Sequence, residues 1–595
     1  MFFYRLTCMK KILLVLIGIP LVFAECKYAI SRYDQPKYNE SFTHFSYANP
    51  NAPKGGKLVQ YQIGSFDSFN QFVSKGTPAA GLELMYDALM VSSSDEPSTM
   101  YGLVAKCIDI SEDRKSVTFT LNPEAKFSNN VPIKSSDVAF TFNLLMKYGD
   151  PAFKHYYHDV SHVEMDGENK VKFYLKTDQN RELPKILGQL PVFSKVFWSG
   201  KDFQSSQFII PLASGPYTIS TYQPGKFIQY TRNDNYWAKN HPVRKGLYNF
   251  DIMRWDYYMN DTVAFEAFKS HEYDIRNEFS SKLWATGYPE DLVQPNKIIK
   301  SRMINRQPQG MQGFVFNTRR HIFKDRKVRE AIAKAFDFNW TNKNLFYSQY
   351  DKSYSYFNNS ELAAPQTLSE TEKEIFNKFN NQLSDEFFLN PTTRSYPKSE
   401  EEFRAELIEA DKQLTEAGWI ISNGRRVHKL TRQPMDFEIL IVMPAFERVL
   451  LPFKQNLKQL GINMSIRLVD PSQFADRVRQ FDYDMTIHTY LVSLTPGNEL
   501  RDYWHSSSAS VKGSQNLSGI KNPVVDQLIL NVIQSKNRSE MIQNIHALDR
   551  VLMWEFYLIP QWYIGAYRVA YWDKFAMPSV QPPYDLGIEA WWSKP

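Results

Sequence analysis

Residues 481–500 (FDYDMTIHTYLVSLTPGNEL) concentrate the side-chain types that hydrolases use in catalysis. The chemically active residues of this stretch are Asp482, Asp484, His488, Ser493, Thr495 and Glu499. Carboxylates and imidazoles act as general acids and bases, and a hydroxyl acts as a nucleophile when a base lies within hydrogen-bond reach. Composition alone therefore permits two interpretations, a catalytic cluster or the wall of a pocket that only binds a ligand.

The elements around this stretch predict a parallel sheet. Residues 437–443 form a short apolar run typical of a buried strand, residues 445–462 carry apolar side chains at helical spacing, and residues 464–469 alternate as a strand. Asp470-Pro471 suits the start of a second helix, and residues 482–490 predict the next strand. This order is β-α-β-α-β, the unit of a parallel sheet. Within the first helix we expect a kink at Pro452, and we expect Gly461 to follow its end.

The direction of the last strand separates the candidate catalytic groups. Ligands of open parallel sheets bind beyond the carboxyl ends of the strands. Asp482 and Asp484 stand at the amino end, whereas residues 490–497 stand at the carboxyl end. A strand of eight residues spans about 25 Å, so the acids and the hydroxyls cannot meet at one reacting atom. We therefore expect residues 490–497 to form a pocket wall and the two acids to lie away from it.

One stretch has residue types that could bind a metal ion: His155, His158, Asp159 and His162. On a helix, His158 and His162 would share a face and could ligate zinc. However, residues 149–151 (GDP) end the preceding helix, and residues 161–175 predict a hairpin that turns at 166–167. We therefore expect the histidines on a loop and at a strand start, without a metal site.

The remaining motifs leave an enzyme as the weaker alternative. The sequence contains no GxSxG, HExxH, GxxxxGK[ST], GxGxxG or CxxC motif. A secreted peptidase or amidase using His488 or Ser493 stays open. The aromatic clusters at 356–361 and 554–563 are interpreted as core, with a ring-lined cleft as the alternative.

The N-terminus has the features of a secretory signal peptide. Lys10 and Lys11 precede an apolar run at 12–24, and the small Ala24 suits cleavage before Glu25. The run is too short to span a bilayer, although an uncleaved anchor is an alternative. Lipid attachment at Cys26 is not expected, because Glu25 occupies the position before it, where lipoprotein signals have a small residue.

Length and charge narrow the class further. A chain of 595 residues exceeds what one core needs, so we expect two or three domains. Cleavage removes Arg5, Lys10 and Lys11 and no acidic residue, which lowers the formal net charge of +6 by three. A nearly neutral chain of this size does not indicate a nucleic-acid partner. In an oxidising compartment Cys26 and Cys107 could pair, but two cysteines make no metal framework.

Several stretches together resemble the extracellular solute-binding proteins of family 5, which serve ABC importers of peptides, nickel and related cargo. The stretches similar to the family's landmarks are KFSNNVPIKSSDVAFTFNLLM (126–146), LASGPYTI (212–219), NDNYWAKN (233–240) and GFVFNTRRHIFKDRKVREAIAKAFD (313–337). Those similar to its YejA branch are residues 43–58, 65–72, 249–276 and 572–575. The resemblance covers nearly all of the chain that follows the signal peptide.

The resemblance implies an α/β class II periplasmic binding protein fold, with two lobes, three domains and a hinge. Domain I would comprise 25–75, 213–305 and 563–595, domain II 76–212, and domain III 306–562. It implies a monomeric periplasmic binding component without enzymatic activity, metal or cofactor, which closes on an oligopeptide. The partners would be permease and ATPase subunits on separate chains. Peptidoglycan-derived or peptide-nucleotide cargo fits the same branch, with nickel or another non-peptide solute as the rival.

The resemblance also implies which residues contact the ligand. They are Lys75, Gly76, Thr77, Pro78, Tyr156, Tyr157, Glu278, Trp284, Tyr490, Val492, Ser493 and Thr495. Gly76 and Gly497 would let backbone approach the ligand. Peptide-binding relatives place an Asp after the last strand to pair with the ligand's amino group, and this chain has Ser493 there. Either another acid serves (Asp67, Glu278 and Glu499 are candidates) or the ligand terminus is blocked or solvated.

Overall fold

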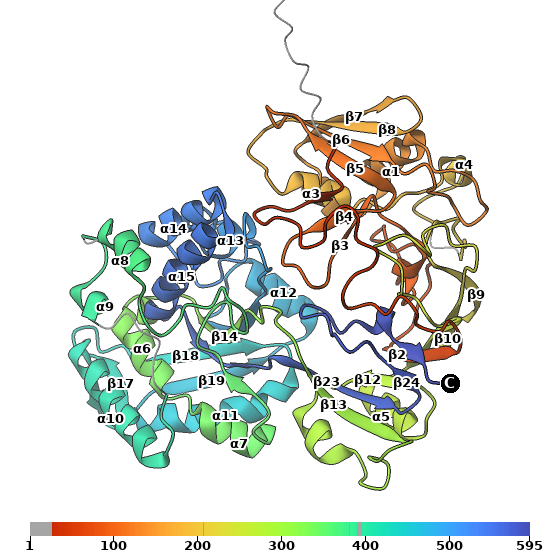
Figure 1. Cartoon of the computed structure of the whole chain (residues 1–595). Coiled ribbons are helices and arrows are strands. Elements are labelled where there is room, and N and C mark those ends of the chain that lie inside the picture. The colour runs from red at the N-terminus through yellow and green to blue at the C-terminus, as the bar shows by residue number, and fades with distance from the viewer. Residues whose placement is uncertain (1–25, 206–207, 380, 390–395) are drawn as a thin grey trace, which may run out of the picture.

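The structure is a computed structural model that describes residues 26–205, 208–379, 381–389 and 396–595. The predicted signal peptide, with Lys10, Lys11 and Ala24, lies outside the described residues. The described chain forms two lobes side by side (Figure 1). The first lobe contains the N-terminal half and the C-terminal tail, and the second contains the residues between β13 (Ile298–Ile304) and β23 (Ala566–Trp572). This arrangement agrees with the predicted two-lobed α/β fold.

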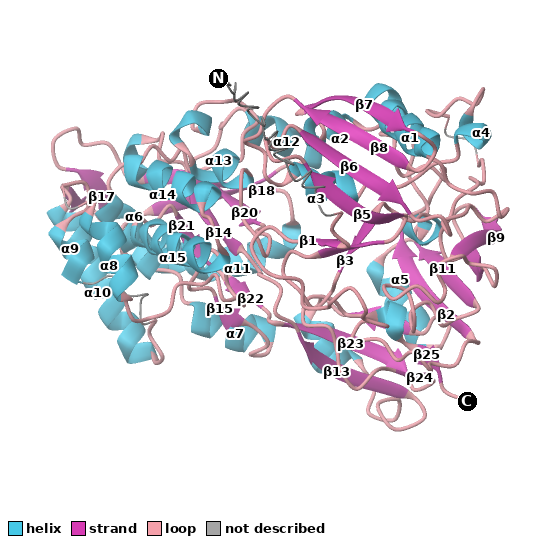
Figure 2. Cartoon of the chain, turned by 45° about the horizontal axis from the view of Figure 1, so that its top comes forward, coloured by secondary structure: helices cyan, strands magenta, loops and turns pink. Residues whose placement is uncertain are grey.

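The upper part of the first lobe is built on an antiparallel sheet of order β5-β6-β8-β7 (Figure 2). Its strands and adjoining helices are β5 (Ala105–Ile110), β6 (Ser116–Leu121), β7 (Val160–Asp166), β8 (Lys170–Leu175), α1 (Ser135–Tyr148) and α2 (Pro151–Tyr156). The β7–β8 hairpin turns at Gly167, where φ is +68°, so the predicted hairpin and its turn are confirmed. Cys26 is disulfide-bonded to Cys107 on β5, as the sequence allowed.

The lower part of the first lobe contains two further sheets. One has the order β2-β11-β10-β9, with strands β2 (Lys57–Ile63), β9 (Tyr217–Gln223), β10 (Phe227–Arg232) and β11 (Ile252–Tyr258). The other has the order β12-β23-β13, with β12 at Ile275–Asn277. Its middle strand, β23, comes from the C-terminal tail, which returns to this lobe in Figure 1. The first lobe is therefore complete only with the last residues of the chain.

The second lobe contains the predicted β-α-β-α-β unit. Its elements are β18 (Asp436–Ile441), α11 (Glu447–Gln459), β19 (Asn463–Leu468), α12 (Pro471–Arg479) and β20 (Met485–Tyr490). β18 pairs in parallel with both β19 and β20, which confirms the prediction. Two antiparallel strands, β14 (Met311–Phe316) and β21 (Leu558–Pro560), extend the sheet in the order β19-β18-β20-β14-β21. Pro452 lies inside α11, and Gly461 follows its end with φ of +74°.

The other elements cover these sheets or connect them. The helices are α3 (Leu183–Gly188), α4 (Lys195–Trp198), α5 (Asp261–Lys269), α6 (Arg326–Lys334), α7 (Phe338–Phe346), α8 (Glu370–Asn377), α9 (Asp385–Leu389), α10 (Glu400–Glu416), α13 (Glu499–Trp504), α14 (Pro523–Gln534) and α15 (Arg538–Trp554). The short strands are β1 (Ala29–Ile30), β3 (Met90–Ser92), β4 (Met100–Gly102), β15 (Asp351–Lys352), β16 (Trp419–Ser422), β17 (Arg425–His428), β22 (Trp562–Tyr563), β24 (Phe575–Ala576) and β25 (Trp592–Ser593). In the described part of the chain, every helix is too short or too polar to cross a membrane.

Candidate functional site

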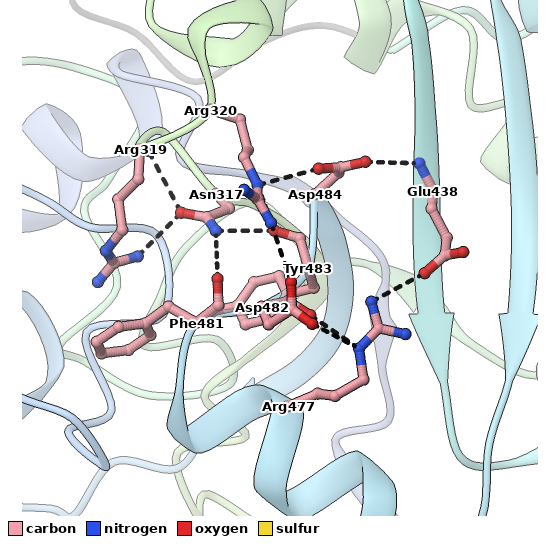
Figure 3. A network of polar contacts seen from close by, with 9 residues as sticks. All are labelled: Asn317, Arg319, Arg320, Glu438, Arg477, Phe481, Asp482, Tyr483 and Asp484. Carbon is pink, nitrogen blue, oxygen red and sulfur yellow. Dashed lines mark hydrogen bonds and ion pairs between the residues drawn. The ribbon is translucent and has the colours of Figure 1, made fainter.

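The acids of the opening cluster anchor the amino end of β20 (Figure 3). The carboxylate of Asp484 lies 3.1 Å from Arg320 Nε, and its Oδ2 accepts a hydrogen bond of 3.0 Å from the backbone N–H of Glu438. Asp482 contacts Arg320 at 3.3 Å and Arg477 at 3.2 Å. Arginine partners neutralise both carboxylates, so the two acids brace the sheet and lie away from the ligand rim, as predicted.

Asn317 explains why β20 starts only at Met485, three residues later than predicted. Its Nδ2 donates to the backbone oxygens of Phe481 at 3.1 Å and Tyr483 at 2.8 Å. Phe481 itself has a φ of +58°. These bonds hold residues 481–483 outside the strand (Figure 3), and β20 is six residues long.

At the opposite end, the parallel strands finish in exposed apolar side chains. Met443 after β18, Leu468 at the end of β19 and Leu491 after β20 are 55%, 42% and 69% exposed. The predicted ligand residues Val492, Ser493 and Thr495 follow Leu491; Ser493 is exposed and the other two are partly buried. Because all three strands run in the same direction, these side chains share one rim, and such a rim suits an apolar part of a ligand.

Ser493 and His488 have other partners in this structure and do not pair with each other. Ser493 Oγ accepts a 3.3 Å hydrogen bond from the backbone N–H of Thr495. His488 packs edge-on against Tyr490, with ring centroids 4.6 Å apart. Burial lowers the pKa of His488 to about 4, so the ring is neutral at pH 7. Among the described residues no hydrogen bond joins His488 to Ser493, and a base that cannot reach a hydroxyl cannot activate it.

A cavity of about 270 Å³ lies on the first lobe between β2 and β12. It is lined by Gln60, Tyr61, Gln62, Ile63, Ile275, Asn277, Phe279, Leu586 and Ile588. The carboxamides of Gln60, Gln62 and Asn277 make no hydrogen bond to other groups of the described chain, and each can both donate and accept. The cavity therefore presents polar groups beside the ring of Phe279, which is 75% exposed.

β2 borders this cavity with an open edge. The backbone N–H of Val59 donates to Asp274 Oδ2 at 2.7 Å, and its carbonyl accepts from Asp274 N–H at 2.8 Å. Backbone groups alternate in direction along a strand, so those of Tyr61 and Ile63 also point away from β11. Within the described residues β2 pairs with no strand other than β11. Beyond Val59 the edge of β2 can therefore accept an added strand.

A chain of side-chain contacts links the cavity to the apolar rim. Tyr350 of the second lobe donates its hydroxyl to the carbonyl of Phe279, 3.4 Å away. Arg568 of β23 donates to that carbonyl at 2.7 Å and to the Tyr350 hydroxyl at 3.2 Å. Tyr350 packs 6.1 Å from Trp562, which stacks on Phe446 just beyond β18. This chain of contacts joins the wall of one lobe to the rim of the other.

The structure places one group of predicted contacts together. Lys75, Gly76, Thr77 and Pro78 form an exposed loop. Asp67 Oδ1 accepts from the N–H of Thr77 at 2.5 Å and would lie 2.8 Å from a Cβ on Gly76, whose φ is +83°. Ser74 Oγ donates to Asp150, the N-cap of α2, at 2.5 Å. The loop therefore adjoins the helix that carries the exposed Tyr156.

Two predicted tyrosine contacts are wrong for the side chains. Tyr157 is buried in the core of the β5-β6-β8-β7 region, 5.5 Å from Phe142. Tyr490 is buried in the second lobe, 5.7 Å from Trp504. The Tyr157 ring packs against α1 and the Tyr490 ring against α13, so neither side chain is exposed to a ligand in this structure. For the aromatic cluster at 356–361, the predicted core position is confirmed, since Tyr356 and Phe357 are buried.

Glu278 and Trp284 already make contacts with other residues of the first lobe. Glu278 is buried and binds Arg276 at 2.8 Å and the N–H of Ser280 at 2.8 Å. Trp284 is partly buried, and Lys300 Nζ lies 4.7 Å from its ring centroid. The buried Glu278 carboxylate already accepts from three donors, Arg276, Tyr288 and the N–H of Ser280, so we do not propose it as the amino-group partner.

Glu499 is a different case. Its Oε2 accepts a 3.0 Å hydrogen bond from the N–H of Gly497, and burial raises the pKa of its carboxyl group. Gly497 was predicted to let the backbone approach the ligand. However, a Cβ on Gly497 would lie 3.1 Å from Arg32 Nη1, so the Arg32 side chain occupies that space.

Of the four candidate metal ligands, only His158 and Asp159 contact each other among the described residues, at 2.9 Å. His155 lies on α2 instead of the predicted loop, His158 lies in the turn after it, and His162 lies on β7. His162 stacks on Tyr174, with centroids 4.4 Å apart. In the described ranges no three His, Cys, Asp or Glu side chains are grouped to hold a metal ion.

The cavity residues Gln60, Gln62, Asn277 and Phe279 and the bridging Arg568 were not anticipated. Their only sequence signal is polar residues inside otherwise apolar strands, Gln60 and Gln62 in KLVQYQI. A hydrogen bond joins Val59 of β2 to Asp274, the residue before β12, although the two are 215 positions apart. No local sequence pattern predicts such a contact.

With this geometry defined, comparison with known proteins decides the family. The family model for bacterial extracellular solute-binding proteins, family 5, matches residues 99–512. The chain belongs to that family. Its substrate-binding role for an ABC importer follows, and the predicted class II fold is confirmed by solved structures.

Relatives of this solute-binding protein align over nearly its full length. A probable peptide-binding protein YejA of Agrobacterium fabrum is 39% identical over 574 residues, which is 95% of this chain and 93% of the relative. A peptidoglycan-binding protein YepA of the same organism is 35% identical over 590 residues, 96% of this chain and 95% of the relative. The predicted YejA branch is thereby confirmed.

Two solved structures share the fold. AppA of Bacillus subtilis, an oligopeptide-binding protein in complex with a nonapeptide, has a TM-score of 0.61 at 19% identity, over 92% of this chain and 100% of the other. NikA of Brucella suis, in complex with Fe(III)-EDTA, has a TM-score of 0.68 at 16% identity, over 91% and 100%. One fold thus serves different ligands, so the ligand has to be argued from the site.

Proposed function

We propose that this protein is a periplasmic receptor that captures oligopeptides between its lobes and delivers them to an ABC importer. The observation that carries the proposal is the cavity beside the open edge of β2, which side-chain contacts link to the apolar rim of the second lobe. An extended peptide can add to a strand edge through its main chain, and this pairing does not depend on side-chain sequence. The carboxamides of Gln60, Gln62 and Asn277 supply further partners for peptide groups.

The rim of the second lobe complements this wall. Met443, Leu468 and Leu491 offer apolar surface to ligand side chains without fixing their identity. Apolar contacts supply affinity, and main-chain hydrogen bonds fix orientation. Broad peptide specificity is the expected result, and peptidoglycan-derived peptides fit the same chemistry.

Closure would occur about the segments that connect the lobes. The chain leaves the first lobe through residues 305–310 and returns through 564–565, and Asn305 N–H donates to the carbonyl of Gly565 at 3.1 Å. Two neighbouring crossings make a natural hinge. We retain the proposed domains: domain I from 25–75, 213–305 and 563–595, domain II from 76–212, and domain III from 306–562. The signal peptide, the monomeric state, and the separate permease and ATPase partners belong to the same proposal.

Mass spectrometry of the bound ligand tests the function. The protein is exported to the periplasm, purified without denaturation, and denatured to release what it carries. A ladder of short peptides is expected, and one defined peptidoglycan peptide would narrow the proposal to a dedicated receptor. Metal without peptide, or cleavage of an added peptide that Ser493→Ala abolishes, would overturn it.

A further inference from the structure

The segment Ser31–Asp34, which we call the strap, belongs to the first lobe but makes contacts with the second. We propose that the strap is a latch that holds the lobes closed and positions the rim loop (residues 491–497) over the ligand. This inference rests on the proposed capture of ligand by lobe closure. It assigns Arg32 and Asp34 a positioning role, since neither needs to touch the ligand.

The root of the strap is fixed in the first lobe. The disulfide joins Cys26 to Cys107, and Lys27 exchanges two backbone hydrogen bonds of 2.8 Å with Ile108. β1 then pairs with β4, and Ser31 Oγ lies 3.1 Å from Ser98 Oγ. A covalent bond and a short ladder thus hold the chain immediately before the strap, so a force applied to the strap is transmitted to the whole first lobe.

Arg32 carries the main contact across the gap. Its side chain is only 4% exposed, and Nη1 lies 2.8 Å from Glu182 of the first lobe. Nη2 donates to the carbonyl of Ile533, in the last turn of α14, at 3.2 Å. On its other side, Nη1 is 3.1 Å from the place of a Cβ on Gly497, the last residue of the rim loop. One guanidinium therefore joins both lobes and borders the rim loop.

Tyr33 and Asp34 extend the contact. Tyr33 packs against the hydrophobic core of the second lobe. Asp34 Oδ2 lies 4.0 Å from Arg538 Nε at the start of α15. Arg538 also pairs with Glu361 and donates to the carbonyl of Leu494, in the middle of the rim loop, at 3.4 Å. The strap and the rim loop are thus held by the same arginine.

The charges make this latch sensitive to the loss of one member. Glu182 and the partly buried Glu499 both lie near Arg32, and Glu499 is partly compensated by it. Removing Arg32 leaves Glu182 with Lys185, 3.7 Å away, as its remaining cationic partner, and the two acids then repel each other across the lobes. Opening of the lobes admits water to these acids. Loss of Arg32 should therefore favour the open state.

Distance measurement between two spin labels in ligand-free protein tests the latch. Val196→Cys on the first lobe and Ile408→Cys on the second place the labels on strongly exposed residues. We expect a narrow distance distribution with the native strap, and a broader one with a longer mean distance with Arg32→Ala or with Asp34→Ala. Arg32→Lys should restore part of the narrow population, since it keeps the charge but not the forked hydrogen bonds. Arg479→Gln, which removes an exposed arginine within the second lobe, is the matched control.

Dissociation of a labelled tetrapeptide pool supplies the functional readout. We expect Arg32→Ala to raise the dissociation rate about tenfold or more, as expected from the loss of a charge-assisted hydrogen bond. If folded Arg32→Ala shows the native distance distribution, the latch is refuted. If the unmutated protein binds no tetrapeptide, the proposed function fails, whereas the label distances still decide whether the strap holds the lobes.

Discussion

Arg276 and Glu278 stand two positions apart and form an ion pair of 2.8 Å in which both side chains are 1% exposed. The guanidinium also binds both oxygens of Asp261 at 2.8 Å. The Asp261 side chain is 53% exposed, so removing Glu278 leaves the buried guanidinium with one carboxylate partner at the surface and none in the interior. We expect Glu278→Gln to lower the free energy of unfolding by about 3 kcal/mol in denaturant titrations.

The variant Glu278→Gln also tests whether Glu278 stabilises the fold or binds the ligand. Peptide affinity of Glu278→Gln should change less than about twofold, because the carboxylate is buried and already accepts from Arg276, Tyr288 and Ser280 N–H. A tenfold loss of affinity with native stability would restore Glu278 as the amino-group partner. Asp261→Asn is the control, since the exposed Asp261 side chain should contribute at most about 1 kcal/mol.

Asp484 and Asp482 should differ although both contact Arg320. Asp484→Ala leaves the backbone N–H of Glu438 without its acceptor and should cost about 1–3 kcal/mol in thermal or denaturant unfolding. Asp482 is 61% exposed, and Asp482→Ala should cost at most about 1 kcal/mol. Neither change should alter peptide affinity, since β20 separates these residues from the rim by about 20 Å. A loss of affinity in either variant would contradict this assignment.

The cavity carboxamides predict a direct effect on binding. Gln62→Leu combined with Asn277→Leu should weaken peptide binding about tenfold in calorimetric titrations, because each lost hydrogen bond contributes about 0.5–1.5 kcal/mol. Stability should stay near that of the native protein. Gln433→Leu, on an exposed turn of the second lobe, is the matched control. Unchanged affinity in the double variant would remove this cavity from the ligand site.

Asp549 of α15 predicts a pH-dependent stability. It is buried and accepts from the N–H groups of Tyr356 at 2.7 Å and Ala364 at 3.0 Å. Burial raises the pKa of its carboxyl group from 3.8 to about 6. The folded protein therefore takes up this proton at higher pH than the unfolded chain, so the contribution of Asp549 to stability rises as pH falls from 7 to 4.

Comparison with Asp549→Asn isolates that contribution, because the amide does not titrate. The contributions of the other titratable groups cancel in the difference between the two proteins. The difference in unfolding free energy, native minus variant, should rise by about 2 kcal/mol between pH 7 and pH 4. A difference that stays constant or falls over this range would contradict the raised pKa.

The disulfide predicts redox-dependent stability. Cys26 and Cys107 are 81 positions apart, and a crosslink of that span restricts the unfolded chain. The double variant Cys26→Ser with Cys107→Ser should lose about 4 kcal/mol. Reductant should lower the unfolding midpoint of the native protein to that of the double variant. It should leave the midpoint of the double variant unchanged. Equal midpoints with and without reductant would show that the bond does not form.

Periodicity predicted the parts of this fold that are local. The alternation and helical spacing from Phe437 to Tyr490 specified β18 to β20 and their helices, and strand direction alone separated Asp484 from Ser493. Local periodicity could not predict which distant parts of the chain pack together. Tyr490 was assigned to the rim because the strand ends there, but Trp504 of α13 covers its ring. The cavity depends on two strands brought together from distant parts of the chain.

The placement of β23 has a consequence for how the protein matures. Residues 566–572 form the middle strand between β12 and β13, so these two early strands have no partner until nearly the whole chain is available. Contacts of such long sequence separation form slowly. A chain that emerges from a translocation channel N-terminus first would assemble the second lobe before the lower part of the first. Truncation before Ala566 should therefore leave exposed strand edges and an aggregation-prone first lobe, even though every residue of the second lobe is present.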